Sequence, residues 1–334
     1  MQTLQGAVDE MATRTKFSGV VRVDRAGHTE LASAYGFSDR AHQIHNTLET
    51  QFGIASGTKG LTALVVMALV ERGTIDLSAT ARSLLGDDLP LVADDVTIEH
   101  LLAHRSGIGD YLDEHALDAI SDYVMSVPVH ELAATEQFLA VLGGHETVFP
   151  AGERFAYNNG GYVLLALLAE RASGLDFHRL VRELVCDPAG MVDSAFLRSD
   201  ELPGRAALGY LFVDGLRTNV LHLPVLGTGD GGIYSTAGDV SAFWQSLFAG
   251  RIVSLDLVAE MVRPHSDWPE ESKRYGLGFH LDATSDAVVL EGHDAGVSFV
   301  SLHQPSSAIT YTVISNWSEG AWPIATLLDE RLGT

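Results

Sequence analysis

Short runs of apolar and β-branched residues lie near both ends of the chain. Residues 19–23 (GVVRV) and 30–35 (ELASAY) flank the turn-forming segment 24–27 (DRAG), and this pattern predicts an antiparallel hairpin. Similar runs, separated by turn-forming residues, return towards the C-terminus at residues 275–281, 287–290, 298–303 and 309–315. Both ends of the chain are therefore predicted to form β-strands.

The sequence between these ends has helical periodicity. A long apolar helix is predicted from about residue 56 to residue 72, with Gly73 in the position that commonly ends a helix. Helical patterns also occupy residues 162–172 and 240–248. Two more helices are predicted close to the chain ends, at residues 3–15 and 323–331.

This order of elements indicates an α+β fold in which one antiparallel sheet is assembled from both termini and flanked by helices. We expect residues 1–75 and 266–334 to form this sheet lobe, and residues 76–265 to form an inserted, mainly helical lobe. Together they would make one contiguous catalytic unit. The cleft between two such lobes is where a functional site is expected.

Composition and charge narrow the possible partners. The chain has 334 residues, 46% of them hydrophobic and 19% charged, as in ordinary globular proteins. Its net charge of −23 is not offset by any basic patch, which argues against nucleic acid or anionic membranes as partners. An apolar leader and a run of roughly 20 apolar residues are both missing, so a cytoplasmic protein without a membrane span is expected. The single cysteine, Cys186, excludes an internal disulfide.

A short polar step, Ser56-Gly-Thr-Lys59, interrupts the long apolar run. On a helix, residues three apart share a face, so the hydroxyl and the amine can lie side by side. A lysine held away from water generally has a lowered pKa, so its neutral amine is available to accept the serine proton, and this arrangement can make the serine a nucleophile. The alternative is a serine that caps the helix, followed by a surface lysine.

Two later segments carry further polar groups. Tyr157 and Asn159 lie in a glycine-rich stretch at a predicted helix start, where a phenol can relay protons and an amide can hold a carbonyl. His293 and Gly296 lie between two predicted strands, where a polar side chain and a backbone N–H can face a reacting carbonyl. Taken singly, these segments are better explained as a capped turn and a β-turn.

Taken together and in order, the three segments resemble the motifs of the serine β-lactamase and penicillin-binding-protein superfamily. The branch most similar to this chain contains class C β-lactamases, D-alanyl-D-alanine carboxypeptidases and related esterases. The resemblance covers nearly the whole chain and includes the segments FGIASGTKGLTALVVMALVERGTIDL, LLAHRSGIGDY, FPAGERFAYNNGGYVLLALLAERASG, GDGGIYSTAGDVSAF and YGLGF.

The resemblance implies a role for each matching residue. Ser56 would be the acylated nucleophile, Lys59 its base, and Tyr157 a general acid or base. Asn159 would bind the acyl side of the substrate. His293 would occupy the first position of the third motif, and Gly296 would supply a backbone N–H to the oxyanion. No metal and no cofactor are implied.

The third motif departs from the β-lactamase pattern. The Lys-Thr-Gly of those enzymes is replaced here by His293-Asp294-Ala295, and an aspartate would repel the carboxylate of a penicillin. We therefore expect a serine hydrolase that acts on short-chain carboxylic esters. The alternatives are a β-lactamase or a D-amino-acid peptidase or carboxypeptidase, with an amide or lactam as the small-molecule substrate. A catalytically silent penicillin-binding-like sensor is a further alternative, and the sequence does not specify an oligomeric state.

Two other patterns are weaker. His100 and His104 have the spacing of zinc ligands on a helix but lack the glutamate of such motifs, so a metal site is not expected. Residues 227–232 (GTGDGG) resemble a nucleotide-binding loop but follow no strand–helix unit, and they are interpreted as a tight turn beside the cleft.

Overall fold

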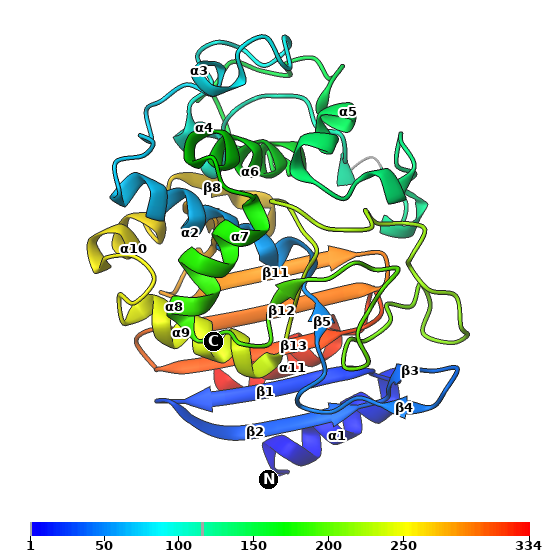
Figure 1. The fold of residues 1–334 in the computed structure, drawn as a ribbon. Helices are drawn as coiled ribbons and strands as arrows, with labels where there is room; N and C mark the ends of the chain where they lie inside the picture. Colours follow the sequence, from blue (N-terminus) through cyan, green and yellow to red (C-terminus); the bar gives the residue numbers. More distant parts are fainter. Residues whose placement is uncertain (1, 115–116) are drawn as a thin grey trace.

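The computed structural model describes residues 2–114 and 117–334, and its centre is an eight-stranded antiparallel sheet (Figure 1). The strand order is β2-β1-β13-β12-β11-β10-β9-β8. The strands are β1 (Gly19–Arg25), β2 (His28–Tyr35), β8 (Ser266–Trp268), β9 (Lys273–Tyr275), β10 (His280–Asp282), β11 (Val288–Asp294), β12 (Val297–Gln304) and β13 (Ile309–Ser315).

The register of the sheet joins the two ends of the chain. Strand β1 pairs with β2, which confirms the predicted hairpin, and on its other side β1 pairs with β13, with Val21 opposite Val313. The sheet is therefore assembled from both termini, and the predicted α+β class is confirmed.

Helices cover both faces of the sheet. Helices α1 (Leu4–Thr15) and α11 (Trp322–Leu332) pack together on one face, where Val8, Tyr311 and Leu328 belong to a shared apolar cluster. On the other face lie α2 (Thr58–Glu71) and α9 (Ala237–Phe248), whose apolar side chains belong to the main core.

The segment between β5 and β8 supplies most of the remaining elements. Its helices are α3 (Arg82–Leu85), α4 (Ile98–Leu102), α5 (Leu139–Leu142), α6 (Asn159–Ser173), α7 (Phe177–Val181), α8 (Asp187–Ala189) and α10 (Leu255–Met261). Figure 1 shows α3, α4, α5 and α6 beyond α2, on the side away from α1, while α7, α8 and α10 lie nearer to α9. The short strands are β3 (Phe37–Asp39), β4 (Ile44–His45), β5 (Phe52–Gly53), β6 (Ala195–Phe196) and β7 (Ile233–Ser235). The single turns of 3-10 helix are η1 (Ala55–Gly57), η3 (Ile120–Asp122), η4 (Val129–Glu131), η5 (Thr135–Phe138) and η7 (Pro269–Glu271), and η6 (Arg182–Cys186) is a π-helical turn.

Two predicted elements differ from the structure. The strand expected at residues 275–281 is two strands, β9 and β10, because the chain bends at Gly276–Phe279 and Gly278 adopts a left-handed φ of +91°. The long helix expected from residue 56 begins at Thr58, because Ser56 lies in the 3-10 turn η1.

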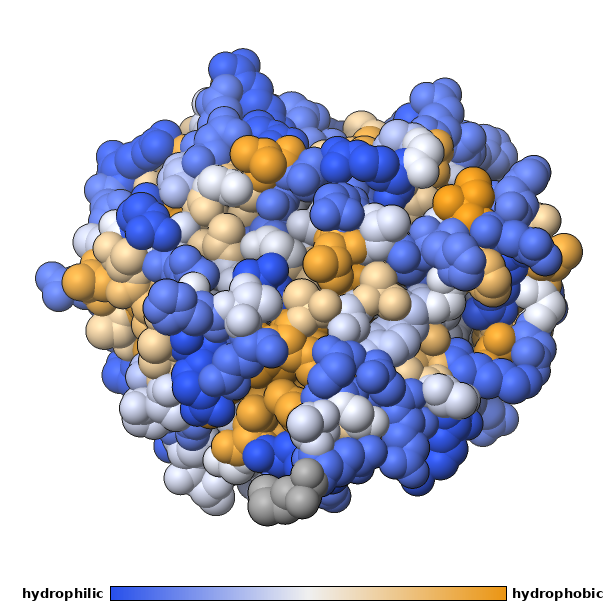
Figure 2. Space-filling model, turned by 90° about the horizontal axis from the view of Figure 1, so that it is seen from below, coloured by the Kyte–Doolittle hydropathy of each residue, from blue (hydrophilic) through white to orange (hydrophobic). Residues whose placement is uncertain are grey.

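The molecular surface is mostly hydrophilic. Figure 2 views the molecule from below, and apolar residues form a narrow strip there between broad hydrophilic areas. This distribution agrees with the net charge of −23. Within the described residues, none of the helices has the length and apolarity to cross a membrane.

The close packing of β11 on the turn before Ser56 gives a testable prediction. A Cβ atom added at Gly292 would lie 2.1 Å from the Ile54 carbonyl oxygen, which is main chain and cannot rotate away. We therefore expect Gly292→Ala to lower the free energy of unfolding by about 1–3 kcal/mol, as in overpacked cores.

The control is Gly204→Ala, since a Cβ atom there meets nothing within 4 Å. Urea unfolding followed by circular dichroism measures both variants. Equal stability of the two variants would contradict the tight packing of β11 against this turn.

Candidate active site

Ser56 lies in a constrained turn between β5 and α2. The preceding residue, Ala55, has a left-handed φ of +44°, a conformation that a residue with a side chain rarely adopts. Strand β11 packs directly against this turn. Such strain persists only where the surrounding structure imposes it, and it is common at functional sites.

Lys59 follows one helical turn later and is buried, with 1% of its surface exposed. Its Nζ lies 2.9 Å from Ser56 Oγ, 2.8 Å from Asn159 Oδ1 and 2.9 Å from the Asp230 carbonyl oxygen. The predicted side-by-side placement of the serine and the lysine is therefore present in the structure.

The chemistry of these three partners is compatible with transfer of the Ser56 proton to the lysine amine. The oxygens of Asn159 and Asp230 only accept hydrogen bonds, whereas the Ser56 hydroxyl can also donate. A neutral lysine amine has two N–H bonds and one lone pair. It can donate to the two acceptors and receive the Ser56 proton on its lone pair.

Tyr157 lies two residues before α6, and its side chain lines the same groove as Ser56 and interacts with it. Lys59 Nζ lies 4.9 Å from the centre of the Tyr157 ring. Burial, followed by the negative charge of Glu114, raises the pKa of the Tyr157 phenol well above its usual value, although the contact with Ser56 opposes this shift. The phenol therefore holds its proton at neutral pH.

Asn159 is the first residue of α6, and its side-chain amide is fully engaged. Its Oδ1 accepts from Lys59, and its Nδ2 donates to Glu114 Oε1 at 2.8 Å and to the Leu112 carbonyl at 3.2 Å. A substrate carbonyl would have to replace one of the two acceptors of Nδ2. The structure thus brings Asn159 to Lys59 and links it to Glu114.

The two residues expected from the third segment lie in different places. His293 is on β11 at the rim of the site, where its Nε2 lies 3.0 Å from Glu319 Oε1. Gly296 is in the two-residue turn between β11 and β12, and its N–H donates to Ser318 Oγ at 2.9 Å in a buried position. This N–H is already occupied and Gly296 lines neither cavity beside Ser56, so the structure does not bring it to the site.

Ser56 lies where two cavities meet. One is a narrow cavity of about 80 Å³, walled mainly by apolar side chains that include Tyr123, Met125 and Phe138. The other is an open groove of about 980 Å³ that Tyr157 and Trp268 line. Ser56 and Asn159 border both spaces, while Tyr157 lines only the groove.

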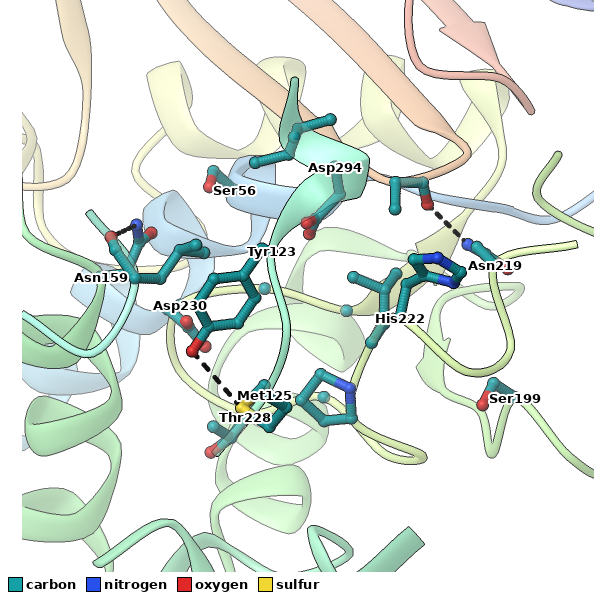
Figure 3. A pocket seen from close by; sticks show the side chains of 18 of the residues that line it. Ser56, Tyr123, Met125, Asn159, Ser199, Asn219, His222, Thr228, Asp230 and Asp294 are labelled. Carbon is teal, nitrogen blue, oxygen red and sulfur yellow. Dashed lines mark hydrogen bonds between the residues drawn. The ribbon is translucent and has the colours of Figure 1, made fainter. Parts of the chain in front are cut away.

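Carboxyl groups surround this junction. Asp230, Asp294 and Glu114 line the narrow cavity, and Figure 3 shows Asp230 and Asp294 in its wall with Ser56 nearby. Burial, together with the charges of Glu114 and Asp230, raises the pKa of Asp294 to about 8. Burial also raises the pKa of Asp230, and it raises that of Asp110, which binds the N–H groups of Asn159 and Gly160, to about 6.

These values change the expectation for Asp294. Its carboxyl is mostly protonated at neutral pH and is not a fixed negative charge. Compared with a Lys-Thr-Gly motif, this site therefore differs mainly by lacking a positive charge. Repulsion of a substrate carboxylate by Asp294 is the smaller difference.

Sequence reasoning did not single out Asp230 or Glu114. Asp230 stands in the loop of residues 227–232, which the sequence predicts beside the cleft, and the GDGG segment around it belongs to the family resemblance but carries no assigned role there. Tyr111, whose hydroxyl donates to Asp230 Oδ2, is a further member of this group. Glu114 had no local signal, since its partner Asn159 is 45 residues away.

The histidine pair noted in the sequence is divided by the end of a helix. His100 lies in α4, where its Nδ1 accepts from the Thr97 N–H, and His104 lies beyond the helix with a left-handed φ of +54°. Over residues 2–114 and 117–334, His, Cys, Asp and Glu side chains form no group of three or more that could hold a metal ion.

This chain is similar in sequence and in structure to several known proteins. The family model described as "Beta-lactamase" matches residues 4–330. The chain is 27% identical to the putative penicillin-binding protein PbpX of Bacillus subtilis over 79% of its own length and 62% of the relative's. It is 32% identical to esterase EstB of Burkholderia gladioli over 62% of its own length and 54% of the relative's.

The chain thus spans between about half and two thirds of the length of these two relatives. Among solved structures, a penicillin-binding protein from Bacillus halodurans superposes with a TM-score of 0.91 at 33% identity, covering 97% of this chain and 99% of the other.

The raised pKa of Asp294 predicts a pH-dependent effect on stability. The folded protein keeps the Asp294 proton up to about pH 8, whereas an unfolded aspartate releases it near pH 4. The folded state therefore binds more protons over this interval, and the wild type loses stability as the pH rises through it. Asp294→Asn cannot titrate, so its stability relative to wild type should increase steadily between pH 4 and pH 8.

The measurement is urea unfolding of wild type, Asp294→Asn and the exposed control Asp95→Asn at several pH values. Only the first variant should show a stability difference that changes with pH. A difference that stayed constant with pH would contradict the assignment of this proton to Asp294.

Proposed function

Because the chain belongs to the beta-lactamase family, we propose that it is a serine hydrolase that forms an acyl-enzyme on Ser56 and acts on short-chain carboxylic esters. The observation that carries this proposal is the position of Ser56. It lies at the junction of a narrow cavity and an open groove, and it is hydrogen-bonded to a buried lysine. The small volume of the narrow cavity supports a short acyl chain or short leaving group.

Acylation begins with transfer of the Ser56 proton to Lys59, as the hydroxyl oxygen attacks the ester carbonyl. The Asn159 and Asp230 oxygens hold the lysine amine in place throughout this step. Tyr157 keeps its phenolic proton at neutral pH and can pass it to the departing alkoxide. Water then attacks the acyl-enzyme, and the same groups act in reverse. The protons of Lys59 and Tyr157 form one coupled system.

The position of Tyr157 supports one placement of the ester, with its acyl group and its alcohol in different cavities. A general acid has to reach the leaving group, and Tyr157 faces the groove but does not line the narrow cavity. The alcohol therefore leaves into the groove, and the acyl group occupies the narrow cavity. Since the groove is wide, the alcohol can be larger than the acyl group.

A cephalosporin fits this site less well than a neutral ester. Its carboxylate would find no lysine in the third motif, and His293 at the rim is engaged with Glu319. The acidic side chains that line the narrow cavity add an unfavourable potential for an anion. The silent-sensor alternative would allow acylation of Ser56 but no turnover.

The test is steady-state hydrolysis of a nitrophenyl acetate beside a chromogenic cephalosporin, for wild type and Ser56→Ala. We expect the ester to be hydrolysed faster, and Ser56→Ala to reduce kcat/KM by at least about a thousandfold, as removal of a nucleophile does elsewhere.

The other outcomes discriminate among the alternatives. A wild type that prefers the cephalosporin would indicate a β-lactamase. Stoichiometric acylation of Ser56 without turnover of either compound would indicate the silent sensor. Ester turnover that survives in Ser56→Ala would remove Ser56 from the mechanism.

A second candidate substrate has an amino group on its acyl part, as D-amino-acid esters and amides do. The observation that favours it is the excess of carboxyl groups lining the narrow cavity, one of which holds a proton because it is buried beside other negative groups. A substrate ammonium can take the place of that proton. The acyl cavity would then select positive over neutral and negative acyl groups.

Methyl esters of β-alanine, propanoic acid and succinic acid test this preference, because they differ in acyl charge at similar size. We expect kcat/KM at pH 7 to fall in the order cationic, neutral, anionic, by about tenfold over the series, which corresponds to about 1.4 kcal/mol. In Asp294→Asn the preference for the cation should shrink. The same rate for all three esters would exclude the amino-acyl candidate while leaving the ester hydrolase intact.

A further inference from the structure

His104 is a buried histidine in an unusual position beside the proposed catalytic tyrosine. It follows α4 with a left-handed φ of +54°, and only 1% of its surface is exposed. Its ring lies among tyrosines, with centroid distances of 4.4 Å to Tyr157, 4.9 Å to Tyr162 and 4.7 Å to Tyr275.

The polar groups of His104 bind the main chain on both sides of Tyr157. The His104 carbonyl accepts the N–H of Ala156 at 2.9 Å, and its Nδ1 accepts the N–H of Asn158 at 3.0 Å. Tyr157 is therefore held between two hydrogen bonds to one residue, and its ring also packs on the imidazole. The backbone of Tyr157 therefore has little conformational freedom.

This arrangement costs stability. Because Nδ1 accepts a hydrogen bond, the ring proton is on Nε2, which is buried and has no hydrogen-bond partner among the described residues. An unpaired buried donor costs about 1–3 kcal/mol. A left-handed backbone at a residue with a side chain adds a second cost.

The imidazole also resists protonation. Burial, followed by the charge of Lys59 and the neighbouring His280, holds the pKa of His104 well below its usual value. The Nδ1 acceptor is therefore present throughout the neutral range. An apolar ring here would remove the unpaired N–H but would leave the Asn158 N–H without its acceptor.

We propose that His104 is a positioning residue, whose Nδ1 and carbonyl hold the Tyr157 segment so that the phenol stays in contact with Ser56. This inference rests on the role proposed for Tyr157 in the hydrolase. His104 itself does not touch the substrate or the reacting atoms.

Two substitutions separate the acceptor from the ring. In His104→Asn the amide oxygen takes the place of Nδ1, and asparagine tolerates the left-handed φ. In His104→Phe the ring remains but the acceptor is lost. We expect His104→Phe to lower kcat for the nitrophenyl ester by up to about a hundredfold, as small misplacements of catalytic groups do, with little change in KM. His104→Asn should recover most of this loss.

The matched control is Ser266→Ala, which removes a hydrogen bond to the carbonyl of Ala103, next to His104, without touching the Tyr157 segment. Circular dichroism and urea unfolding establish that each variant is folded at the assay temperature. A His104→Phe protein with normal kcat and reduced stability would overturn the proposal. So would a His104→Asn protein as slow as His104→Phe.

A double-mutant cycle tests whether His104 acts through Tyr157. If it does, adding His104→Phe to Tyr157→Phe causes no further loss of kcat, because the hydroxyl being positioned is already absent. Fully additive losses would mean that the two residues act independently, and would overturn the proposal.

A measurement that needs no natural substrate separates the positioning role of His104 from the proposed ester hydrolysis. The rate at which a fluorophosphonate labels Ser56, followed by intact mass, reports how well the hydroxyl is activated. If the wild type is labelled but does not hydrolyse esters, the proposed substrate class fails, and slow labelling of His104→Phe still supports positioning. Labelling of His104→Phe at the wild-type rate overturns the positioning role. A wild type that is not labelled at Ser56 overturns both proposals.

Discussion

The buried amine of Lys59 is the constraint on which the organisation of the site depends. Its three oxygen partners come from Ser56, Asn159 and Asp230, which belong to segments that are far apart in the sequence. A buried amine without partners would be strongly destabilising, so the turn before α2, the start of α6 and the loop before β7 have to meet at one point. None of these segments can shift alone without leaving a buried polar group unpaired.

The same burial determines the charge of the site. Carboxyl groups from three separate segments lie close to one lysine, and water is too scarce there to screen them. As a result, Asp294 keeps its proton at neutral pH. Its net charge is therefore a property of the whole group, and each new charge that enters redistributes protons among its members.

The sequence was most informative where the determining interactions are local. The hairpin of β1 and β2 follows from alternation and a turn, and the Ser56–Lys59 contact follows from helical spacing. The break between β9 and β10 was missed because it depends on distant packing: a Cβ atom at Gly278 would lie 2.3 Å from Ala63 Cβ on α2. Local propensity cannot detect such a neighbour.

The same difference between local and distant interactions explains which residues of the site could be predicted from the sequence. The resemblance to a known family identified Ser56 and Asn159, two of the three residues that meet at Lys59, since these stand in recognisable motifs, but it did not single out Asp230. It did not identify Glu114, which acts through a partner far along the chain, and it assigned Gly296 to the oxyanion. The tight turn after β11 directs the Gly296 N–H to Ser318, and only the three-dimensional path of that turn makes this visible.

The pairing of β1 with β13 has a consequence for biosynthesis. Residues 19–25 are made almost 300 residues before their partners at residues 309–315. During this interval β1 has only its hairpin partner β2, and an isolated hairpin is marginally stable in water. The growing chain therefore cannot close its sheet on the ribosome until the last strand emerges. Contacts of such long sequence separation also favour slow folding, and the nascent protein exposes a β-strand edge until residues 309–315 are made.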